Sequence, residues 1–494
     1  MIRIVGPLLV TLAMLLAIEA GLRVAGIPAR GGGGDATLLD ILPMFQPSTG
    51  PDGVPLMLRH DQKGVAFRQE KPANGLRVFV LGDSSAIGFP FGPEFAFPRF
   101  LQERLAAAMP DRTVEVVNCG LNAVASWHGR EILDEIVRYQ PDAIIVYIGN
   151  GDWITPGPEA SSPALKLLSN LHIYQLAALA GRKWQPPQKG KIDVERVHSR
   201  ADGFRLARER ARGNQTLTAR EREWILARYA DNLRAIVATA RRAGATVILS
   251  DLIQNLSDFP PGASRHRRGL SDAERAQWRE AMMQADARLR AQDYRGALDD
   301  LARAERIDQR PAILHYMRAK CLEALGDYAA AREEYRVASD LDEAPLGVPS
   351  AVNGVIREVA KETGVQFVDL AGSLAATTPH GMLGDGLFYD YVHPTVAGHA
   401  RIANVFAIAL GAPDGDGGAP DVSAITAAHP EVQDWIYRAN TLLFIMLGWY
   451  DRALAEVDEA GERYPELRPL RGAVEDVRAK DPVRSWDDFP DAPD

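Results

Sequence analysis

Residues 77–88 read RVFVLGDSSAIG, and this stretch points to the fold class of the chain. The run from Arg77 to Leu81 has the length and apolar character of a short buried strand. A turn flanked by glycines follows it and contains Asp83 and Ser84. A serine at the end of a buried strand lies at the edge of a sheet. The stretch therefore predicts an α/β fold with a candidate nucleophile, Ser84, at the carboxyl end of a strand.

Strands and helices alternate through much of the remaining sequence. Further strands are expected at 113–117, 143–148, 245–252 and 365–370, and helices at 94–109, 126–139, 219–243, 351–362 and 397–410. Thr218 is expected to cap the helix that begins at residue 219. This alternation predicts a parallel sheet that is covered by helices on both faces.

We divide the chain into six segments. They are a membrane anchor at 1–27, a linker at 28–75, the two parts of the α/β domain at 76–265 and 348–411, a helical insertion at 266–347, and a linker with a C-terminal helical, repeat-like region at 412–494. The first linker is expected because a glycine run and several prolines interrupt regular helix there.

The predicted anchor is an apolar run near the N-terminus. Ile4–Ile18 contains no charged residue and follows Arg3. The run is long for the core of a signal peptide, and no clean cleavage site precedes Arg30, so we expect an uncleaved signal anchor. The alternatives are a cleaved signal peptide and a soluble core helix. An anchor of this kind places the rest of the chain on the extracytoplasmic, periplasmic side of a membrane.

The helical insertion contains an internal repeat. The run that begins at Asp293 recurs 34 residues later at Asp327, and Ala304 recurs at Ala338 with the same offset. A helix-turn-helix unit of this period resembles a tetratricopeptide repeat, and a partial third copy begins near residue 448. With so few units, we expect the repeats to pack on the α/β domain and to be separable from its chemistry. The alternative is a groove that binds a protein partner.

A carboxylate and a histidine lie near the end of the α/β domain. Asp390 precedes His393 by three residues. A carboxylate at this spacing reaches Nδ1 of the histidine across one turn and leaves Nε2 free to take the proton of a serine. With Ser84, these residues predict a Ser-His-Asp triad. The alternative is a turn serine and a capping aspartate near a surface histidine.

Composition excludes several other kinds of function. The chain has 494 residues and a formal net charge of -9, and this argues against nucleic acid as a partner, because phosphate binding requires a basic face. Two cysteines are too few for a disulfide framework or a thiolate zinc site. The other histidines lack ligand spacing, so we expect no metal and no organic cofactor.

With the triad, the chain resembles the SGNH hydrolase, or GDSL-like esterase and lipase, family over roughly 76–260 and 350–410. The resemblance implies a flavodoxin-like three-layer αβα sandwich, here with a helical insertion and a C-terminal helical segment. It also implies that Ser84 is the nucleophile and that Asp390 and His393 complete the triad. The anchor, the repeats and the segment SDLIQNLSDFPP at 250–261 are similar to a bacterial subgroup of the family.

Two positions depart from the pattern of that family. The resemblance implies three oxyanion donors, namely the backbone N–H of Ser84, the backbone N–H at a glycine position that Ala123 occupies here, and an asparagine side chain. Gly151 stands where the asparagine is expected, and Asn150 stands one residue earlier. We expect Asn150 to be the donor, because glycines on both sides leave its backbone free to re-aim the side chain. Asn150→Ala then lowers kcat by about 10²-fold. If Asn150 is not the donor, Asn150→Ala has almost no effect on kcat and Gly151→Asn raises activity.

These patterns predict a membrane-anchored, extracytoplasmic serine esterase. Its substrate is an ester-bearing small molecule, lipid or polysaccharide, and the helical repeats are a candidate site for a protein partner. Two alternatives stay open. One is an acyltransferase that uses the same triad on a sugar or lipid hydroxyl, and the other is a non-catalytic scaffold built on a degenerate hydrolase domain.

Overall fold

The computed structural model describes residues 43–154 and 217–480, apart from 60, 61, 63, 123, 344, 415–421, 431–435, 439, 442–443, 446–447 and 466–467, together with Ala20. The predicted anchor at 1–27 lies outside these residues except for Ala20. Within the described ranges, no helix combines the length and apolar composition that a bilayer crossing requires.

A five-stranded parallel sheet forms the centre of the molecule. Its strands are β4 (Gly75–Gly82), β5 (Thr113–Asn118), β6 (Ala143–Tyr147), β7 (Thr246–Ser250) and β8 (Gln366–Val368). The order is β5-β4-β6-β7-β8, which is the flavodoxin-like arrangement. β4 and β6 are buried along their whole length, which explains why they read as continuous apolar runs rather than as alternating patterns.

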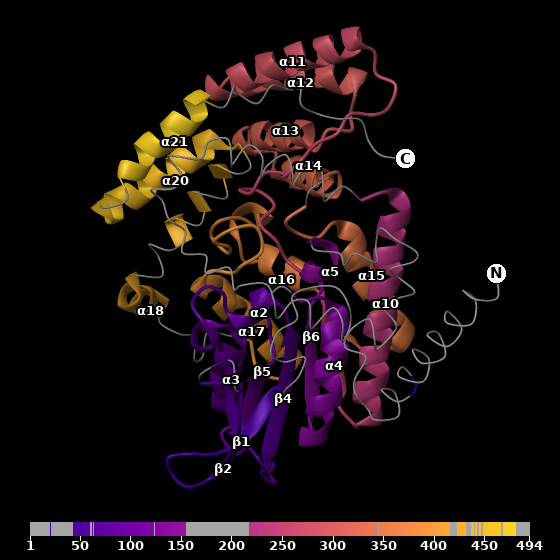
Figure 1. Cartoon of the computed structure of the whole chain (residues 1–494), viewed down its shortest axis with the longest axis vertical. Helices are drawn as coiled ribbons and strands as arrows, with labels where there is room; N and C mark the ends of the chain where they lie inside the picture. The colour runs from indigo at the N-terminus through magenta and orange to yellow at the C-terminus, as the bar shows by residue number, and fades with distance from the viewer. Residues whose placement is uncertain are drawn as a thin grey trace, which may run out of the picture.

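Helices cover both faces of this sheet, and the predicted three-layer sandwich is confirmed. On one side α3 (Phe97–Ala108) packs against α17 (Val396–Ala409), and on the other α10 (Ala219–Arg242) packs between α4 (Ser126–Ile136) and α15 (Ser350–Thr363) (Figure 1). Thr218 caps α10 as predicted, because its side chain accepts the N–H of Glu221. The shorter elements are α2 (Ser84–Ile87), η2 (Pro93–Phe95), η3 (Val137–Tyr139), α5 (Asn150–Ile154), α16 (Leu370–Ala375), η5 (Pro379–Gly381) and α18 (Val422–Ala428).

Part of the predicted linker is a folded sheet instead. The strands β1 (Phe45–Thr49), β2 (Pro55–Arg59) and β3 (Ala66–Arg68) pair in antiparallel order. Phe67 of β3 packs edge-on against Phe79 of β4, with ring centroids 5.5 Å apart. The prolines block helix but not this sheet, because Pro47 lies in an edge strand and Pro55 is the first residue of its strand. The prediction of a linker is therefore wrong for this stretch.

The inserted segment forms two helical hairpins. They are α11 (Asp272–Arg290) with α12 (Tyr294–Ile307) and α13 (Ala312–Ala324) with α14 (Tyr328–Asp340). The repeat has a physical basis, because Asp293 and Asp327 cap α12 and α14, and Ala304 and Ala338 are buried at the same place in each hairpin. α20 (Tyr450–Arg463) and α21 (Pro469–Lys480) follow near the end of the chain. These helices lie beyond α2 and α5, which follow β4 and β6, and so beyond the carboxyl ends of the central strands (Figure 1).

Candidate active site

Ser84 is the first residue of α2, and one residue, Asp83, separates it from the end of β4. Asp83 caps this short helix by accepting the N–H of Ser85 at 3.0 Å. Gly82 is required at the end of the strand, because a Cβ there would lie 2.2 Å from the Cβ of Ala86. The tight turn from strand to helix therefore places Ser84 at the carboxyl end of β4, as predicted.

Residues 383–393, here called the acid–base loop, carry the carboxylate and the histidine. Asp390 Oδ1 accepts the backbone N–H groups of Val392 and His393, both at 2.9 Å. Its Oδ2 lies 2.7 Å from Nδ1 of His393. These contacts form the single turn that the spacing predicted.

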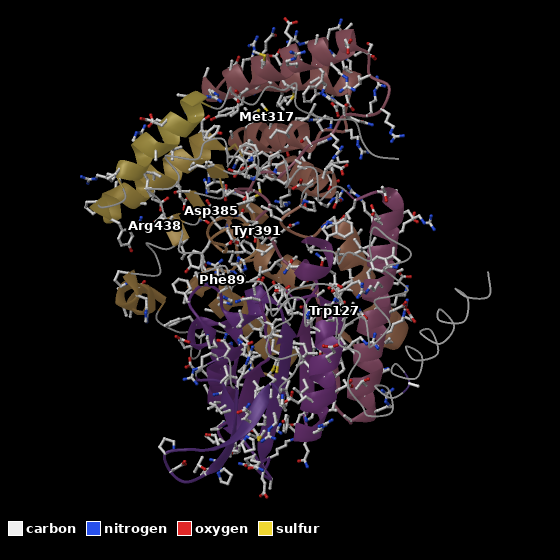
Figure 2. All side chains as sticks on the ribbon, viewed as in Figure 1. Phe89, Trp127, Met317, Asp385, Tyr391 and Arg438 are labelled. Carbon is white, nitrogen blue, oxygen red and sulfur yellow. The ribbon has the colours of Figure 1, made fainter. Side chains whose placement is uncertain are left out.

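The acid–base loop brings His393 to Ser84. Nε2 of His393 lies 2.8 Å from Oγ of Ser84, although the two residues are 309 positions apart. The ring of Phe89 lies against the imidazole, with ring centroids 4.7 Å apart. Phe89 and Tyr391 occupy the zone between the sheet and the helical regions (Figure 2). The structure thus brings together the three residues that the sequence predicted as a triad.

The electrostatics of the pair suit a general base. Burial lowers the pKa of His393, but the neighbouring Asp390 carboxylate outweighs this effect and the net pKa is raised above its usual value. Burial raises the pKa of Asp390, but the charge of His393 and the N–H groups that bond the carboxylate give a net lowering. Asp390 therefore stays ionised and favours the protonated form that His393 adopts when it takes a proton.

Asn150, the predicted oxyanion donor, lies beside the turn that bears Ser84, and its side chain bonds to Asp83 in that turn. Its Nδ2 donates to Oδ2 of Asp83 at 2.9 Å, and only 4% of the residue is exposed. Burial raises the pKa of Asp83, and the hydrogen bonds from Ser85 and Asn150 partly oppose that rise. A carboxamide nitrogen carries two hydrogens, so one is left for a substrate. The oxyanion role of Asn150 stays a prediction.

The contact with Asp83 changes what a mutation of Asn150 tells us. Asn150→Ala removes a partner of a buried carboxylate, so a silent result is no longer the expected outcome even if Asn150 does not contact the oxyanion. Sequence reasoning missed this link, and the only signal for it was the position of Asp83 as a helix cap. Ala123, the other predicted backbone donor, lies outside the described residues.

Gly151 is held in place by the neighbouring loop. A Cβ at this position would lie 2.0 Å from the carbonyl oxygen of Val124, closer than two such atoms approach. Val124 is itself fully buried, so its backbone has little room to move. The backbone of Val124 therefore occupies the space that a side chain at position 151 requires.

We expect Gly151→Asn to lower activity and stability rather than to raise activity. The clash is with backbone, and overpacking of this kind typically costs about 1–3 kcal/mol. Thermal unfolding and kcat of the purified variant measure both effects. Gly354→Ala in α15 is the matched control, because a Cβ there meets nothing within 4 Å and alanine favours helix. A Gly151→Asn variant that melts at or above the wild type and turns over faster would contradict this expectation.

Comparison with known proteins gives a family match for the domain that contains this site. Residues 80–315 match the family described as GDSL-like lipase/acylhydrolase. The match includes Ser84 and ends before Asp390 and His393, so the joining of the three residues rests on the geometry above. A search of curated proteins gave no match.

Several solved structures are similar to the chain at low identity. A lipase/acylhydrolase from Enterococcus faecalis is 12% identical with a TM-score of 0.31, over 68% of this chain and 95% of that one. The psychrotrophic esterase EstA from Pseudoalteromonas sp. is 10% identical with a TM-score of 0.29, over 68% and 96%. The acetyl xylan esterase AlAXEase is 12% identical with a TM-score of 0.29, over 68% and 100%.

Proposed function

Because the chain contains a domain of the GDSL-like lipase and acylhydrolase family, we propose that it is a serine esterase in which Ser84, His393 and Asp390 form the catalytic triad. Lipases and acylhydrolases cleave carboxylic esters, so the family assigns ester hydrolysis to this chain in general terms. The observation that carries the triad is the continuous line of contacts from Asp390 through both nitrogens of His393 to Oγ of Ser84, at 2.7 and 2.8 Å.

The proposed reaction has two halves that share one base. Oγ of Ser84 attacks the ester carbonyl carbon while Nε2 of His393 accepts the hydroxyl proton. Asp390 stabilises the imidazolium that forms. His393 then gives its proton to the leaving alcohol, and the acyl group stays on Ser84. In the second half His393 takes a proton from water, which attacks the acyl carbon. His393 then returns that proton to Oγ of Ser84 as the bond between Oγ and the acyl carbon breaks, and the carboxylic acid leaves.

The oxyanion of each tetrahedral intermediate needs hydrogen-bond donors. The N–H of Ser84 is one, since it is the first amide of α2. The N–H of Ala123 and the second amide hydrogen of Asn150 are the other proposed donors. Asn150 is supported by its position at the start of α5, beyond the end of β6, the strand that neighbours β4. Donors fixed before the reaction stabilise the developing charge without reorganisation.

The proposed setting is the extracytoplasmic face of a membrane, with residues 1–27 as a single anchor. The apolar run Ile4–Ile18 supports this proposal. The proposed substrates are esters of small molecules, lipids or polysaccharides that reach that face, and the helical repeats are a proposed contact for a protein partner.

We expect a fluorophosphonate probe to label the purified full-length chain at Ser84, with the label located by peptide mass. A series of p-nitrophenyl esters from acetyl to palmitoyl, assayed on the same sample, then identifies the acyl chain length with the highest kcat/KM. Added sugar or lipid alcohols distinguish hydrolysis from acyl transfer, because a transferase produces a new ester. A folded chain that neither labels nor turns over any ester would contradict the proposal and favour the scaffold.

A further inference from the structure

The acid–base loop is bound at both ends to the segment 250–261, which begins at the last residue of β7. The backbone N–H of Leu256 donates to the carbonyl of Leu383 at 2.9 Å. At the other end the backbone N–H of Asn255 donates to the carbonyl of Tyr391 at 2.8 Å. Tyr391 is the residue directly after Asp390, so segment 250–261 holds the backbone that carries the catalytic carboxylate.

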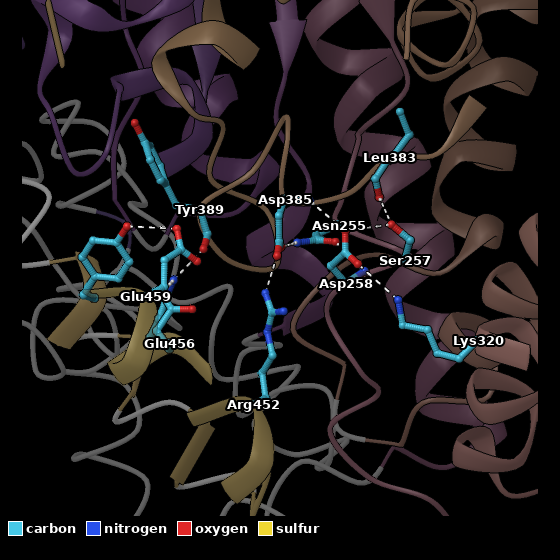
Figure 3. A network of polar contacts seen from close by, with 12 residues as sticks. Asn255, Ser257, Asp258, Lys320, Leu383, Asp385, Tyr389, Arg452, Glu456 and Glu459 are labelled. Atoms are coloured by element: carbon cyan, nitrogen blue, oxygen red, sulfur yellow. Dashed lines mark hydrogen bonds and ion pairs between the residues drawn. The ribbon is translucent and has the colours of Figure 1, made fainter. Parts of the chain in front are cut away.

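The side chain of Asn255 ties the same two segments together a second time. Its Nδ2 donates to Oδ1 of Asp385 at 2.8 Å, and its Oδ1 accepts the N–H of Asp258 at 3.0 Å. The N–H of Asp385 in turn donates to Oδ2 of Asp258 at 3.1 Å. Only 5% of Asn255 is exposed, so this network is a buried hub with charged groups at its rim (Figure 3).

Two cations from the outer helices reach the rim of this hub. Lys320 on α13 of the insertion lies 3.2 Å from Oδ1 of Asp258. Arg452 on α20 donates to Oδ2 of Asp385. Figure 3 shows the two cations approaching the hub from different helices. The insertion therefore contacts segment 250–261, and the C-terminal helix α20 contacts the acid–base loop itself.

The C-terminal region makes a further contact beside the catalytic aspartate. Nδ2 of Asn440 donates to the carbonyl of Tyr389 at 2.6 Å and lies 3.1 Å from Oε1 of Glu456. Asn440 and Glu456 are both buried. Asp390 is thus flanked by two backbone carbonyls, at Tyr389 and Tyr391, and each is held by an asparagine from another part of the chain.

The two ion pairs at the rim, Lys320–Asp258 and Arg452–Asp385, bear on catalysis more than on stability. Asp385 and Arg452 have side chains that are 44% and 34% exposed, and an ion pair so open to water contributes little to folding. Orientation is far more sensitive, because a misplacement of about 1 Å can cost about 10²-fold in rate. His393 contacts Ser84 only if the acid–base loop keeps its position. The outermost contacts that support this position come from Lys320 of α13 and Arg452 of α20.

We propose that Asn255, Lys320 and Arg452 are positioning residues, through which the inserted repeats and the C-terminal helices hold Asp390 and His393 against Ser84. This inference rests on the proposed esterase function. It also gives a role to segment 250–261. It argues against the expected separability of the insertion, since replacing 272–344 removes Lys320.

Arg452→Ala tests the proposal in the full-length chain. We expect kcat to fall about 10-fold with KM unchanged, because the substrate site is intact while the base is misplaced in a fraction of molecules. Arg452→Lys should recover most of the loss, since it restores a cation next to Asp385. Arg478→Ala is the matched control, because Arg478 forms an ion pair with Asp451 in the same helical region. We expect this variant to keep the wild-type kcat.

Lys320→Met gives an independent test from the insertion side, and it decides the matter if Arg452→Ala does not fold. Its kcat should also fall with KM unchanged, while thermal melting stays close to that of the wild type. Fluorophosphonate labelling of the wild type at Ser84 is measured first, so failure of the esterase function is recognised separately. If the wild type labels and the folded Lys320 and Arg452 variants both keep wild-type kcat, the helices do not position the loop and the proposal is overturned.

Discussion

Ser84→Ala is expected to abolish ester turnover, with a loss in kcat of about 10⁴- to 10⁶-fold, and to abolish labelling by a fluorophosphonate. Oγ of Ser84 lies 2.8 Å from Nε2 of His393, and alanine removes that oxygen without adding volume. Kinetics with the best p-nitrophenyl ester and peptide mass mapping of the label check both outcomes.

Ser85→Ala is the matched control for this substitution. Oγ of Ser85 is buried and donates to the carbonyl of Val392 at 3.3 Å, one residue before His393. This is a long hydrogen bond away from the reacting atoms, so we expect a loss of less than about 10-fold. Equal losses from the two changes, or turnover that survives in Ser84→Ala, would remove Ser84 from the role of nucleophile.

Asp390→Asn is expected to lower kcat by about 10⁴-fold, because the amide no longer fixes the imidazole in the tautomer that leaves Nε2 free. The carboxylate also raises the pKa of His393, so the substitution should change the pH profile as well. In the wild type kcat/KM falls as pH falls through the pKa of His393, which lies above its usual value of 6.5. In Asp390→Asn the midpoint of that fall should move to lower pH.

The kinetics of His393→Ala provide the control for this prediction. We expect that change to cost at least as much as Asp390→Asn, and the double variant to be no slower than His393→Ala alone, because the two residues act as one unit. A pH midpoint that stays in place, or a loss of less than about 10-fold, would show that the contact at 2.7 Å does not orient the base.

The family match and the geometry support different parts of the proposed function. The match covers residues 80–315 and therefore the turn that bears Ser84. His393 and Asp390 enter only through their contacts with Ser84 and with each other. The inserted hairpins lie between the turn that bears Ser84 and the acid–base loop in the sequence. Lys320 of α13 contacts Asp258 in segment 250–261, and that segment bonds to the acid–base loop. The arrangement is consistent with one catalytic unit assembled from segments that are distant in sequence.

The sequence by itself determined the features that leave a local trace. Strands buried on both faces, such as β4 and β6, appear as continuous apolar runs. A helix cap such as Thr218 precedes its helix by one residue. The three-residue spacing of Asp390 and His393 corresponds to one turn of backbone, and the repeat offset that relates Asp293 to Asp327 reflects two similar hairpins. In each case the interacting residues are neighbours in the chain or repeat with a regular period.

Only the tertiary structure decided the features that depend on docking between distant segments. The prolines between 43 and 55 suggested a linker, but packing against Phe79 makes that region a sheet. From the sequence, Gly151 is interpreted as the loss of the expected asparagine. In the structure the backbone of Val124 occupies the space that a side chain at this position would need. The contacts of Lys320 and Arg452 with the hub around Asn255 have no sequence pattern at all. Contacts of this kind depend on how separate loops pack together, and packing leaves no periodic signal in either loop alone.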